Sequence, residues 1–521
     1  MEVVNSIRPV LAVGVSLLAA GLILITGERA RNLREFWSIL AAVLKFSIVL
    51  SMVPFILDGK LIEYTAFNIA PGLSIGFKAD ALGIFFGILA SFLWIITSFY
   101  SIGYMRSLNE HAQSRYFACF AIALSATMGV AFSANLFTMF LFYEIITVCT
   151  YPLVAHKETP EAIRGARKYL TYLLGTSVGF QLLAIFMAYH ITGTLDFSYQ
   201  GIFGEARGVV SDTLIIVTFI LFMAGITKAA MMPLHGWLPA AMVAPTPVSA
   251  LLHAVAVVKT GVFVVVKVVV HVFGINLLWD LGLGTSLAYF ASFTIVAASV
   301  IALTEDNLKA RLAYSTVSQL SYVILGIALL TPSGITGSIM HIVLHAFGKI
   351  TLFFTAGAIY VAAHKTKVSE LDGIGKEMPF TMAAFTIGSF SMIGVPPFGG
   401  FISKWYIAMG AIEANQLPIL LVLVSSTILN ACYFLPIVYA AFFKSPAAAQ
   451  HHHGHAREPV HGVALAGIHN PHSTGSKLHE APAIMVIPLT LTAIGTIALF
   501  FAPDFFLEIT RTALDNLRGG R

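Results

Sequence analysis

The stretch AGITKAAMMPLHGWLPAAMVAPTPVSALLHAVAVVKTGVF, residues 224–263, decides the fold of this chain. Two lysines, Lys228 and Lys259, lie in sequence that is otherwise apolar, with four prolines between them. A continuous helix does not tolerate internal prolines. A lysine that faces lipid costs about 2.5–3.5 kcal/mol on the insertion scale, and a broken helix persists at membrane depth only against protein or water. The stretch therefore predicts a polar path across a bilayer.

The composition agrees with a membrane environment. Hydrophobic residues make up 58% of the 521 residues and charged residues 11%, and the mean hydropathy is +0.86. A soluble domain cannot bury that much apolar surface, so we predict an all-α polytopic membrane protein. The net charge of +5 is modest and does not favour nucleic-acid binding. The three cysteines lie at unrelated spacings, which predicts neither a disulfide framework nor a metal site.

About fourteen apolar runs are near the ~20 residues that a helix needs to cross a bilayer. They cover residues 7–26, 36–57, 81–103, 115–133, 135–155, 167–191, 212–245, 248–271, 280–303, 310–330, 335–362, 379–413, 418–443 and 483–503. Connections on one side hold 17 lysines and arginines, and those on the other side hold 7. The positive-inside rule then predicts a multi-pass protein of the cell's inner (plasma) membrane with both termini on the non-cytoplasmic side.

Two of these runs, 212–245 and 379–413, are too long and are interrupted by proline. Each holds a lysine beside its break, Lys228 in the first and Lys404 in the second. The runs are five spans apart, and an odd offset predicts two inverted five-helix repeats with the transport site at the breaks. The predicted units are N-terminal peripheral helices (1–114), the two repeats (115–271 and 280–443), a cytoplasmic loop (445–482) and a final transmembrane helix (483–503).

The loop 445–482 is polar and holds eight of the 17 histidines. Its composition predicts a disordered segment. Solvated low-complexity sequence and adventitious or regulatory metal binding are the two interpretations of its HHHGH run, which lacks the fixed spacing of a structural zinc site.

Six lysines fall within the predicted spans: Lys45, Lys228, Lys259, Lys267, Lys349 and Lys404. We expect most of them to be buried against partners or hydrated, because six lipid-facing lysines would cost on the order of 15–20 kcal/mol. Lys267 is also open to snorkelling towards a helix end, and Lys45 belongs to no motif.

Glu144 lies mid-span with no charged neighbour on its own helix, and Lys228 is its natural partner. Farther along, His341, His345 and Lys349 follow one another at i, i+4 and i+8, which places them on one helical face. Imidazoles donate and accept protons near neutral pH, so this stripe predicts a proton relay. A static buried ion pair and structural histidines are the alternatives. In the relay, Glu144 approaches and leaves Lys228, and the proton passes to Lys259, to His345 and Lys349, and then to Lys404.

Four stretches carry a family resemblance: PLHGWLPAAMVAPTPVSALLHA (233–254), LKARLAYSTVSQLSY (308–322), HIVLHAFGK (341–349) and GVPPFGGFISK (394–404). From about residue 65 to 445 the chain resembles the antiporter-like subunits shared by Mrp-type cation/proton antiporters, respiratory complex I and membrane-bound hydrogenases. The resemblance implies proton-translocating roles for Glu144, Lys228, Lys259, His341, His345 and Lys404, and the length of the chain fits the D-type subunit of the Mrp antiporters best.

The resemblance implies a proton-translocating subunit of a Na⁺(K⁺)/H⁺ antiporter, with other membrane subunits, protons, Na⁺ or K⁺ and lipids as partners. The runner-up is a membrane-arm subunit of a redox complex, in which the chain would belong to an NADH:quinone oxidoreductase. An inorganic-carbon uptake partner and a purely structural subunit are further alternatives. The sequence has no P-loop, dinucleotide fingerprint, haem motif or Fe–S cysteine set, so we predict no cofactor and no enzymatic activity of the isolated chain.

Overall fold

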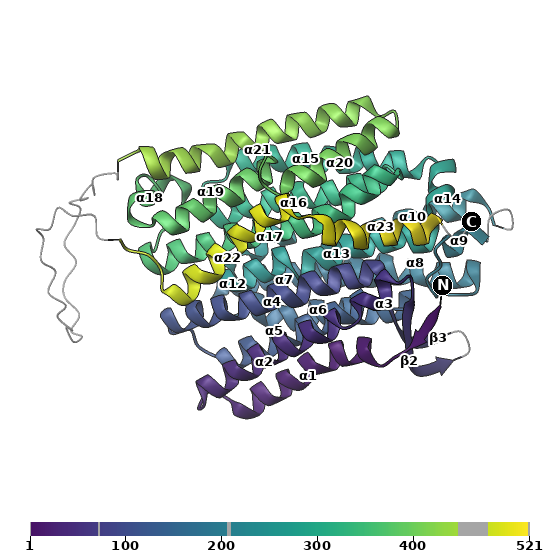
Figure 1. Cartoon of the computed structure of the whole chain (residues 1–521), viewed down its shortest axis with the longest axis horizontal. Helices are drawn as coiled ribbons and strands as arrows, with labels where there is room; N and C mark the ends of the chain where they lie inside the picture. The colour runs from purple at the N-terminus through teal and green to yellow at the C-terminus, as the bar shows by residue number, and fades with distance from the viewer. Residues whose placement is uncertain (1, 71–72, 206–209, 446–477, 519–521) are drawn as a thin grey trace, which may run out of the picture.

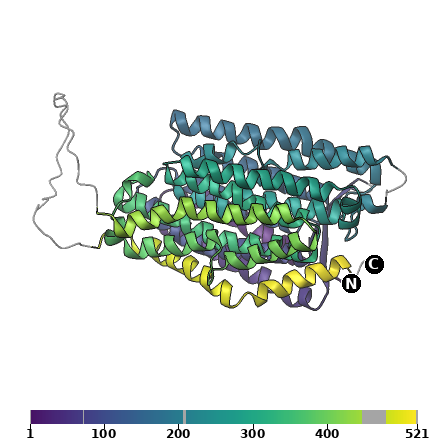
Figure 2. The ribbon, with the colours of Figure 1, turned by 90° about the horizontal axis from the view of Figure 1, so that it is seen from above.

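The computed structural model describes residues 2–70, 73–205, 210–445 and 478–518, and most of these residues are helical. The long helices lie side by side along the longest axis of the molecule (Figure 1; Figure 2). In chain order the helices are α1 (Arg8–Thr26), α2 (Arg31–Leu50), α3 (Val53–Leu57), α4 (Ala81–Ser107), α5 (Gln113–Ala131), α6 (Leu136–Val154), α7 (Pro160–Thr176), α8 (Leu182–Thr192), α9 (Ile202–Glu205), α10 (Asp212–Gly225), α11 (Trp237–Ala240), α12 (Thr246–Ala254), α13 (Val257–Lys267), α14 (Ile275–Asp280), α15 (Leu283–Thr304), α16 (Leu308–Ala328), α17 (Pro332–Ala363), α18 (Ile374–Glu377), α19 (Pro379–Ile393), α20 (Gly400–Glu413), α21 (Leu417–Phe443), α22 (Ala483–Phe501) and α23 (Asp504–Arg518).

The helices have the length and composition of membrane spans. Among the described residues, 11 helical segments are long and apolar enough to cross a bilayer. The three remaining predicted runs are the two proline-broken ones and 310–330, where α16 has 21 residues and a series of hydroxyl side chains. The prediction of a helical, polytopic membrane protein is confirmed, whereas the number of crossings stays a prediction.

The core of the bundle is formed by α12, α13 and α17. In these helices the apolar span windows are completely buried, whereas only a third to a half of the window is buried in α15, α21 and α22. A helix that is apolar on all sides and buried on all sides belongs in the interior of a bundle. Helices α13 and α17 therefore carry their lysines and histidines away from lipid.

The two ends of the bundle differ in what they carry. Strand β1 and the end of α23 lie at one end, so the described chain starts and finishes on the same side (Figure 1). The end of α21 and the start of α22 lie at the opposite end (Figure 1). An even number of crossings produces this arrangement. The predicted His-rich loop falls almost entirely on residues 446–477, which lie outside the described part of the chain.

Both proline-interrupted runs are broken where the sequence predicts a break. Helix α10 ends at Gly225 and is followed by a short 3-10 turn, Thr227–Ala229, and by non-helical residues up to α11. Helix α19 ends at Ile393, and α20 begins only at Gly400. The inverted-repeat relation between the two units and the boundaries of the units stay predictions.

The run 248–271, which the sequence presents as one span, is also interrupted. Helix α12 ends at Ala254, α13 starts at Val257, and a π-helical segment, Val268–Phe273, follows α13 directly. The backbone N–H groups of Val255 and Ala256 both donate to the carbonyl of Leu251. Neither proline nor glycine stands at this interruption, so its position has no signal in the local sequence.

Two features outside the predicted spans were not expected. Strands β1 (Val3–Asn5), β2 (Leu61–Ala70) and β3 (Leu73–Ala79) form a sheet in the order β1-β2-β3. Strand β1 is parallel to β2, and β3 is antiparallel to β2, with Ile62 opposite Ala79. Helix α23 follows the last span and packs on α3, α4 and α17. Both features lie at the end of the bundle that holds the termini (Figure 1).

Candidate functional site: a buried chain of amines and imidazoles

Lys228 lies in the turn that follows α10, inside the first broken helix. Its side chain is fully buried, its Nζ donates to the backbone carbonyl of Tyr143 at 2.7 Å, and it lies 3.1 Å from the centroid of the Tyr143 ring. The Oε1 atom of Glu144 is 4.0 Å from the same Nζ. Neither carboxylate oxygen of Glu144 has a hydrogen-bond partner among the described residues. The carboxylate thus stands just beyond direct contact with the ammonium group.

The broken helix and α13 approach each other closely at Gly261. A Cβ atom on Gly261 would lie 2.3 Å from the carbonyl carbon of Lys228, far inside van der Waals contact. Only glycine allows the two backbones to pack in this way. Lys259 precedes Gly261 by two residues. This contact therefore fixes the backbone of Lys259 relative to the backbone of Lys228.

Lys259 and His345 are in direct contact. The Nζ of Lys259 lies 2.6 Å from Nδ1 of His345, and both side chains are buried. The ring of His345 stacks on that of His341 with 5.6 Å between centroids. Nδ1 of His341 lies 2.8 Å from the Ser403 hydroxyl, and its ring stacks on Tyr322. Helices α13, α17, α16 and α20 therefore each contribute a side chain to one polar line.

Lys349 continues the polar line toward α16 and α21. Its Nζ donates to the Leu312 carbonyl at 3.1 Å and to the Ser315 hydroxyl at 2.7 Å. The Ser315 hydroxyl also hydrogen-bonds the hydroxyl of Tyr433 at 3.0 Å, and Tyr433 in turn donates a short hydrogen bond to Oδ1 of Asn430. The buried ammonium of Lys349 is thereby satisfied by neutral groups.

Lys404 is held by the second broken helix. Its Nζ donates to the carbonyls of Met392 and Ile393, at 2.8 and 2.9 Å, where α19 ends. The free carbonyls at the end of a helix carry partial negative charge and favour a cation. The amide of Asn430 reaches the same Met392 carbonyl at 3.4 Å. Ser315, Tyr433, Asn430 and Met392 therefore connect Lys349 to Lys404.

The hydrogen-bonding groups between the predicted residues were missed in the sequence. They are Tyr143, Ser315, Gln319, Tyr322, Ser403, Asn430 and Tyr433. A signal existed for three of them, because Ser315, Gln319 and Tyr322 recur at helical spacing in the polar run AYSTVSQLSY. Tyr433 and Asn430 lie in an apolar span, and only the packing of α21 on α16 reveals their position.

Two further buried lysines have partners that the sequence did not suggest. Lys45 donates to the Leu124 carbonyl at 2.8 Å and lies 4.6 Å from the Trp94 ring, so it joins α2 to α5 and α4. Lys267 does not snorkel: its buried Nζ donates to Asp80 at 2.6 Å. Of the two alternatives open for Lys267, burial against a partner is the one observed, because a carboxylate lies within reach inside the bundle.

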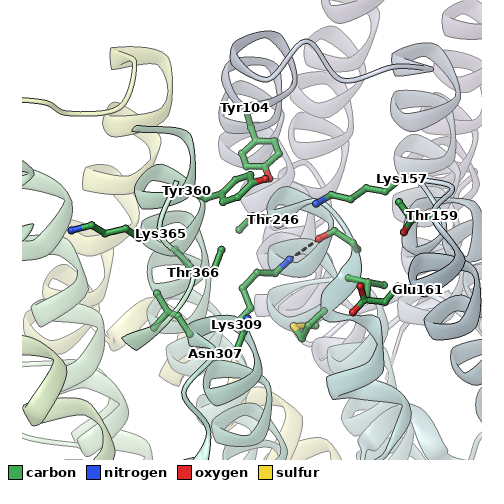
Figure 3. A pocket seen from close by; sticks show the side chains of 15 residues that line it. Tyr104, Lys157, Thr159, Glu161, Thr246, Asn307, Lys309, Tyr360, Lys365 and Thr366 are labelled. Carbon is green, nitrogen blue, oxygen red and sulfur yellow. Dashed lines mark hydrogen bonds between the residues drawn. The ribbon is translucent and has the colours of Figure 1, made fainter. Parts of the chain in front are cut away.

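A cavity of about 310 Å³, drawn in Figure 3, lies near the C-terminal end of α4, away from the sheet that precedes this helix. It lies beside residues 242–246 of the first broken helix and is bordered by Tyr104, Tyr360 and Lys309. Nζ of Lys309 donates to the Ala244 carbonyl at 2.6 Å, and the side chain of Lys157 extends toward the same space (Figure 3). The cavity therefore borders the outer part of the broken helix.

One group of side chains at the same end has the composition of a metal site. Ligand atoms of Glu110, His111 and His156 all lie within 4.8 Å of one another. His156 is buried, and burial lowers its pKa to about 4, so its imidazole is neutral. Beside these histidines, Arg115 pairs with Glu158 at 2.7 Å, and the same carboxylate lies 3.7 Å from Nε2 of His111.

Comparison with known proteins identifies the family. Residues 133–430, more than half of the chain, match the family described as "NADH:quinone oxidoreductase/Mrp antiporter, TM". The chain belongs to this NADH:quinone oxidoreductase/Mrp antiporter transmembrane family. The matched region contains all seven predicted relay residues.

Relatives in the family come from both kinds of complex. The chain is 31% identical over 418 residues to NADH-quinone oxidoreductase subunit N of Desulforudis audaxviator, covering 79% of each chain. It is 30% identical over 514 residues to the putative antiporter subunit mnhA2 of Staphylococcus haemolyticus, covering 94% of this chain and 60% of that protein. Against NAD(P)H-quinone oxidoreductase chain 5 of a Picosynechococcus strain the identity is 30%, with 82% of this chain and 64% of the relative covered. The chain therefore spans less than two thirds of these two longer relatives.

Solved structures share the fold over nearly the whole chain. A chain of the Mrp complex from Dietzia sp. DQ12-45-1b superposes with a TM-score of 0.83 at 24% identity, with 98% of both chains covered. A chain of an archaeal membrane-bound sulfane sulfur reductase also reaches 0.83, at 22% identity and with 98% of both chains covered. At these identities the likeness establishes the architecture of this family member.

Proposed function

We propose that this chain is a proton-translocating membrane subunit of an Mrp-type Na⁺(K⁺)/H⁺ antiporter or a close relative. The single observation that carries the proposal is the buried polar line from Lys259 through His345 and His341 to Ser403, with Lys349 and Lys404 joined through neutral hydrogen-bonding groups. Buried ionisable side chains inside a membrane bundle are expensive and mark ion pathways.

The relay works through changes in the partner of each amine. At 4.0 Å, a small movement of the Glu144 carboxylate brings it into contact with Lys228 and favours the protonated lysine. Withdrawal of the carboxylate leaves the ammonium with the Tyr143 carbonyl and ring alone, and the proton then moves on toward Lys259. Lys259 and His345 share one hydrogen bond of 2.6 Å, along which the proton passes in either direction.

The energies of the relay and of the membrane are comparable. Moving one elementary charge against 100 mV requires about 2.3 kcal/mol. When the pKa of a group changes by two, its free energy of proton binding changes by about 2.7 kcal/mol. A rearrangement that changes the proton affinity of a buried lysine by this amount is therefore sufficient to drive a proton against such a membrane potential.

The same proposal includes orientation, units and partners. The end with the 310 Å³ cavity faces the cytoplasm, since the basic connections gather there, and both termini face the other side. Residues 115–271 and 280–443 are inverted repeats, each with its broken helix and lysine. Other membrane subunits flank the chain. The chain transports protons, and the whole complex exchanges them for Na⁺ or K⁺.

The second candidate is a proton-pumping subunit of a redox complex. The 31% identity to a subunit N over 79% of both chains favours it specifically. In that assembly the same relay would be driven by electron transfer in other subunits. The source of energy distinguishes the two candidates: antiport responds to an imposed Na⁺ or K⁺ gradient, whereas a redox pump responds to an electron donor and a quinone.

Proton movement in liposomes containing the native complex tests the proposal. We expect Glu144→Gln and Lys228→Met each to lower the initial rate of proton flux per assembled complex at least tenfold, about 1.4 kcal/mol in the barrier. Glu413→Gln, on the exposed end of α20, is the matched control and should keep the wild-type rate. Wild-type flux in both relay variants would exclude the relay.

A further inference from the structure

A second group of buried charges lies at the end of the bundle that holds the sheet. Asp80 is the N-cap residue of α4, and its Oδ1 accepts from the backbone N–H of Gly83 at 2.7 Å. Its other oxygen, Oδ2, accepts from Nζ of Lys267 at 2.6 Å. The side chains of Asp80 and Lys267 are 5% and 0% exposed, so this ion pair is shielded from solvent.

His271 faces the same carboxylate oxygen. It lies in the π-helical segment Val268–Phe273, and its Nε2 is 3.8 Å from Oδ2 of Asp80. Nδ1 of His271 is 3.2 Å from the Ser198 carbonyl, which fixes the ring. Nε2 of His271 has no hydrogen-bond partner among the described residues, and neither has the hydroxyl of Tyr199, whose ring contacts the imidazole. Segments with π-helical geometry occur frequently at functional sites.

A small cavity joins these unpaired groups under α23. It measures about 10 Å³ and is bordered by Asp80, Tyr199, His271 and, from α23, Asn516. A cavity of about this size holds one water molecule when two to four polar groups surround it. Helix α23 packs over α4 through contacts such as Phe85 with Phe506, so it covers the cavity as a lid.

Helix α13 carries both a member of this group and a member of the relay. Lys267 follows Lys259 by eight residues on the same helix, which is about 12 Å at 1.5 Å per residue. Lys78 and Glu63 also lie near this group, and they pair with each other at 3.0 Å, with the side chain of Glu63 42% exposed. A purely structural ion pair accounts for Asp80 and Lys267 but leaves the free nitrogen of His271 and the Tyr199 hydroxyl without a reason.

We propose that Asp80, Lys267 and His271 form a proton-exchange site between the relay and the surface at the sheet end, with water under α23 as the outlet. The inference rests on the proposed function. Lys267 and His271 are two bases that face one carboxylate oxygen, so Asp80 neutralises whichever of them carries the proton. A proton leaves Nζ of Lys267, passes by way of Asp80 to Nε2 of His271, and departs through the water-sized cavity. The cluster keeps its charge during the transfer and regains its proton at Lys267 from the relay.

The test uses the native complex in liposomes and two changes to the site. Removing one member of a buried ion pair leaves an uncompensated charge and destabilises the protein, whereas removing both is better tolerated. The first variant is therefore the double substitution Asp80→Asn with Lys267→Met, and the second is His271→Gln. Lys60→Met, which breaks an exposed ion pair with Glu2 at the same end of the molecule, is the matched control.

We expect the amount of assembled complex to be within twofold of wild type for both the double variant and His271→Gln. We expect the proton flux per assembled complex to be at least tenfold lower in both. The Lys60→Met control should keep its flux. Wild-type flux per complex in His271→Gln overturns the inference, as does wild-type flux in the double variant. If the double variant does not assemble, His271→Gln decides alone, because it leaves the ion pair of Asp80 with Lys267 in place.

The same flux measurements distinguish failure of the exchange site from failure of the proposed relay. If Glu144→Gln abolishes flux while the site variants keep it, the relay stands and the exchange site falls. If the wild-type complex moves no protons under any driving force, both proposals fall.

Discussion

At the scale of single residues, the partners of the buried amines decide what each can do. The Nζ groups of Lys228, Lys349 and Lys404 donate to carbonyl or hydroxyl oxygens, and that of Lys259 contacts an imidazole. Neutral acceptors of this kind bind both an ammonium and an amine, so they hold the protonated form less strongly than a carboxylate does. Lys267 differs, because its partner is a carboxylate at 2.6 Å, which it shares with His271.

The hydroxyl of Tyr433 is the most direct test of the connection between Lys349 and Lys404. Tyr433→Phe keeps the buried ring and removes the group that joins Ser315 to Asn430. The net value of one such hydrogen bond is about 0.5–1.5 kcal/mol, so we expect proton flux per assembled complex to fall roughly three- to tenfold with thermal stability reduced by a similar energy at most. Tyr439→Phe, on the exposed side of the same helix, should change neither quantity. Unchanged flux in Tyr433→Phe would place the path elsewhere.

At the scale of elements, the two broken helices use their ends as polar groups. Helix α19 presents the carbonyls of Met392 and Ile393 to Lys404. An ammonium group at a helix C-terminus is stabilised by about 0.3–1 kcal/mol, and by up to ~2 kcal/mol when it is partly buried. In the first broken helix the turn after α10 is held by Trp237, whose Nε1 donates to the Thr227 carbonyl at 3.0 Å. Broken helices therefore supply hydrogen-bonding groups that a continuous helix would satisfy internally.

The contact of α13 with the first broken helix should not accept a larger side chain. Gly261→Ala places a Cβ atom 2.3 Å from the backbone carbonyl carbon of Lys228, which forces the two elements apart. Overpacking of this kind costs about 1–3 kcal/mol, so we expect a lower thermal midpoint of the purified complex and reduced proton flux. Gly175→Ala is the control, since no atom lies within 4 Å of its added Cβ. Equal stability of the two variants would contradict the close packing described for α13.

At the scale of the whole molecule, one end of the bundle holds the termini, the sheet and α23 (Figure 1). The basic connections and the 310 Å³ cavity lie at the opposite end. Figure 2 shows the same elongated arrangement from above. The polar line lies between these ends inside the bundle, and apolar faces of the outer helices are exposed, as lipid or neighbouring subunits require. The shape is that of a subunit whose two ends meet different aqueous compartments.

Labelling from the two sides of the membrane tests this orientation. In a chain whose three native cysteines are replaced by serine, Glu2→Cys should react with a membrane-impermeant maleimide in intact cells. Lys365→Cys, at the cavity end, should react only after the membrane is opened. The opposite result would reverse the orientation and place the exchange site on the cytoplasmic side.

Much of the molecule follows from the sequence by itself. Apolar runs of bilayer length set the spans, because a backbone in lipid must satisfy its hydrogen bonds within a helix. The prolines and lysines of residues 224–263 and 379–413 predicted where helices break, and the spacing of His341, His345 and Lys349 placed them on one buried helix. These are local properties, fixed by neighbours along the chain.

Contacts between distant segments were decided only by the tertiary structure. The pairing of Lys267 with Asp80, the hydroxyl of Tyr433 between α16 and α21, the interruption before α13 and the covering of the exchange site by α23 have no local signature. Each depends on which helix faces which across the bundle. A sequence states that a buried charge needs a partner, but packing alone chooses the partner, because groups 187 residues apart can lie 2.6 Å from each other.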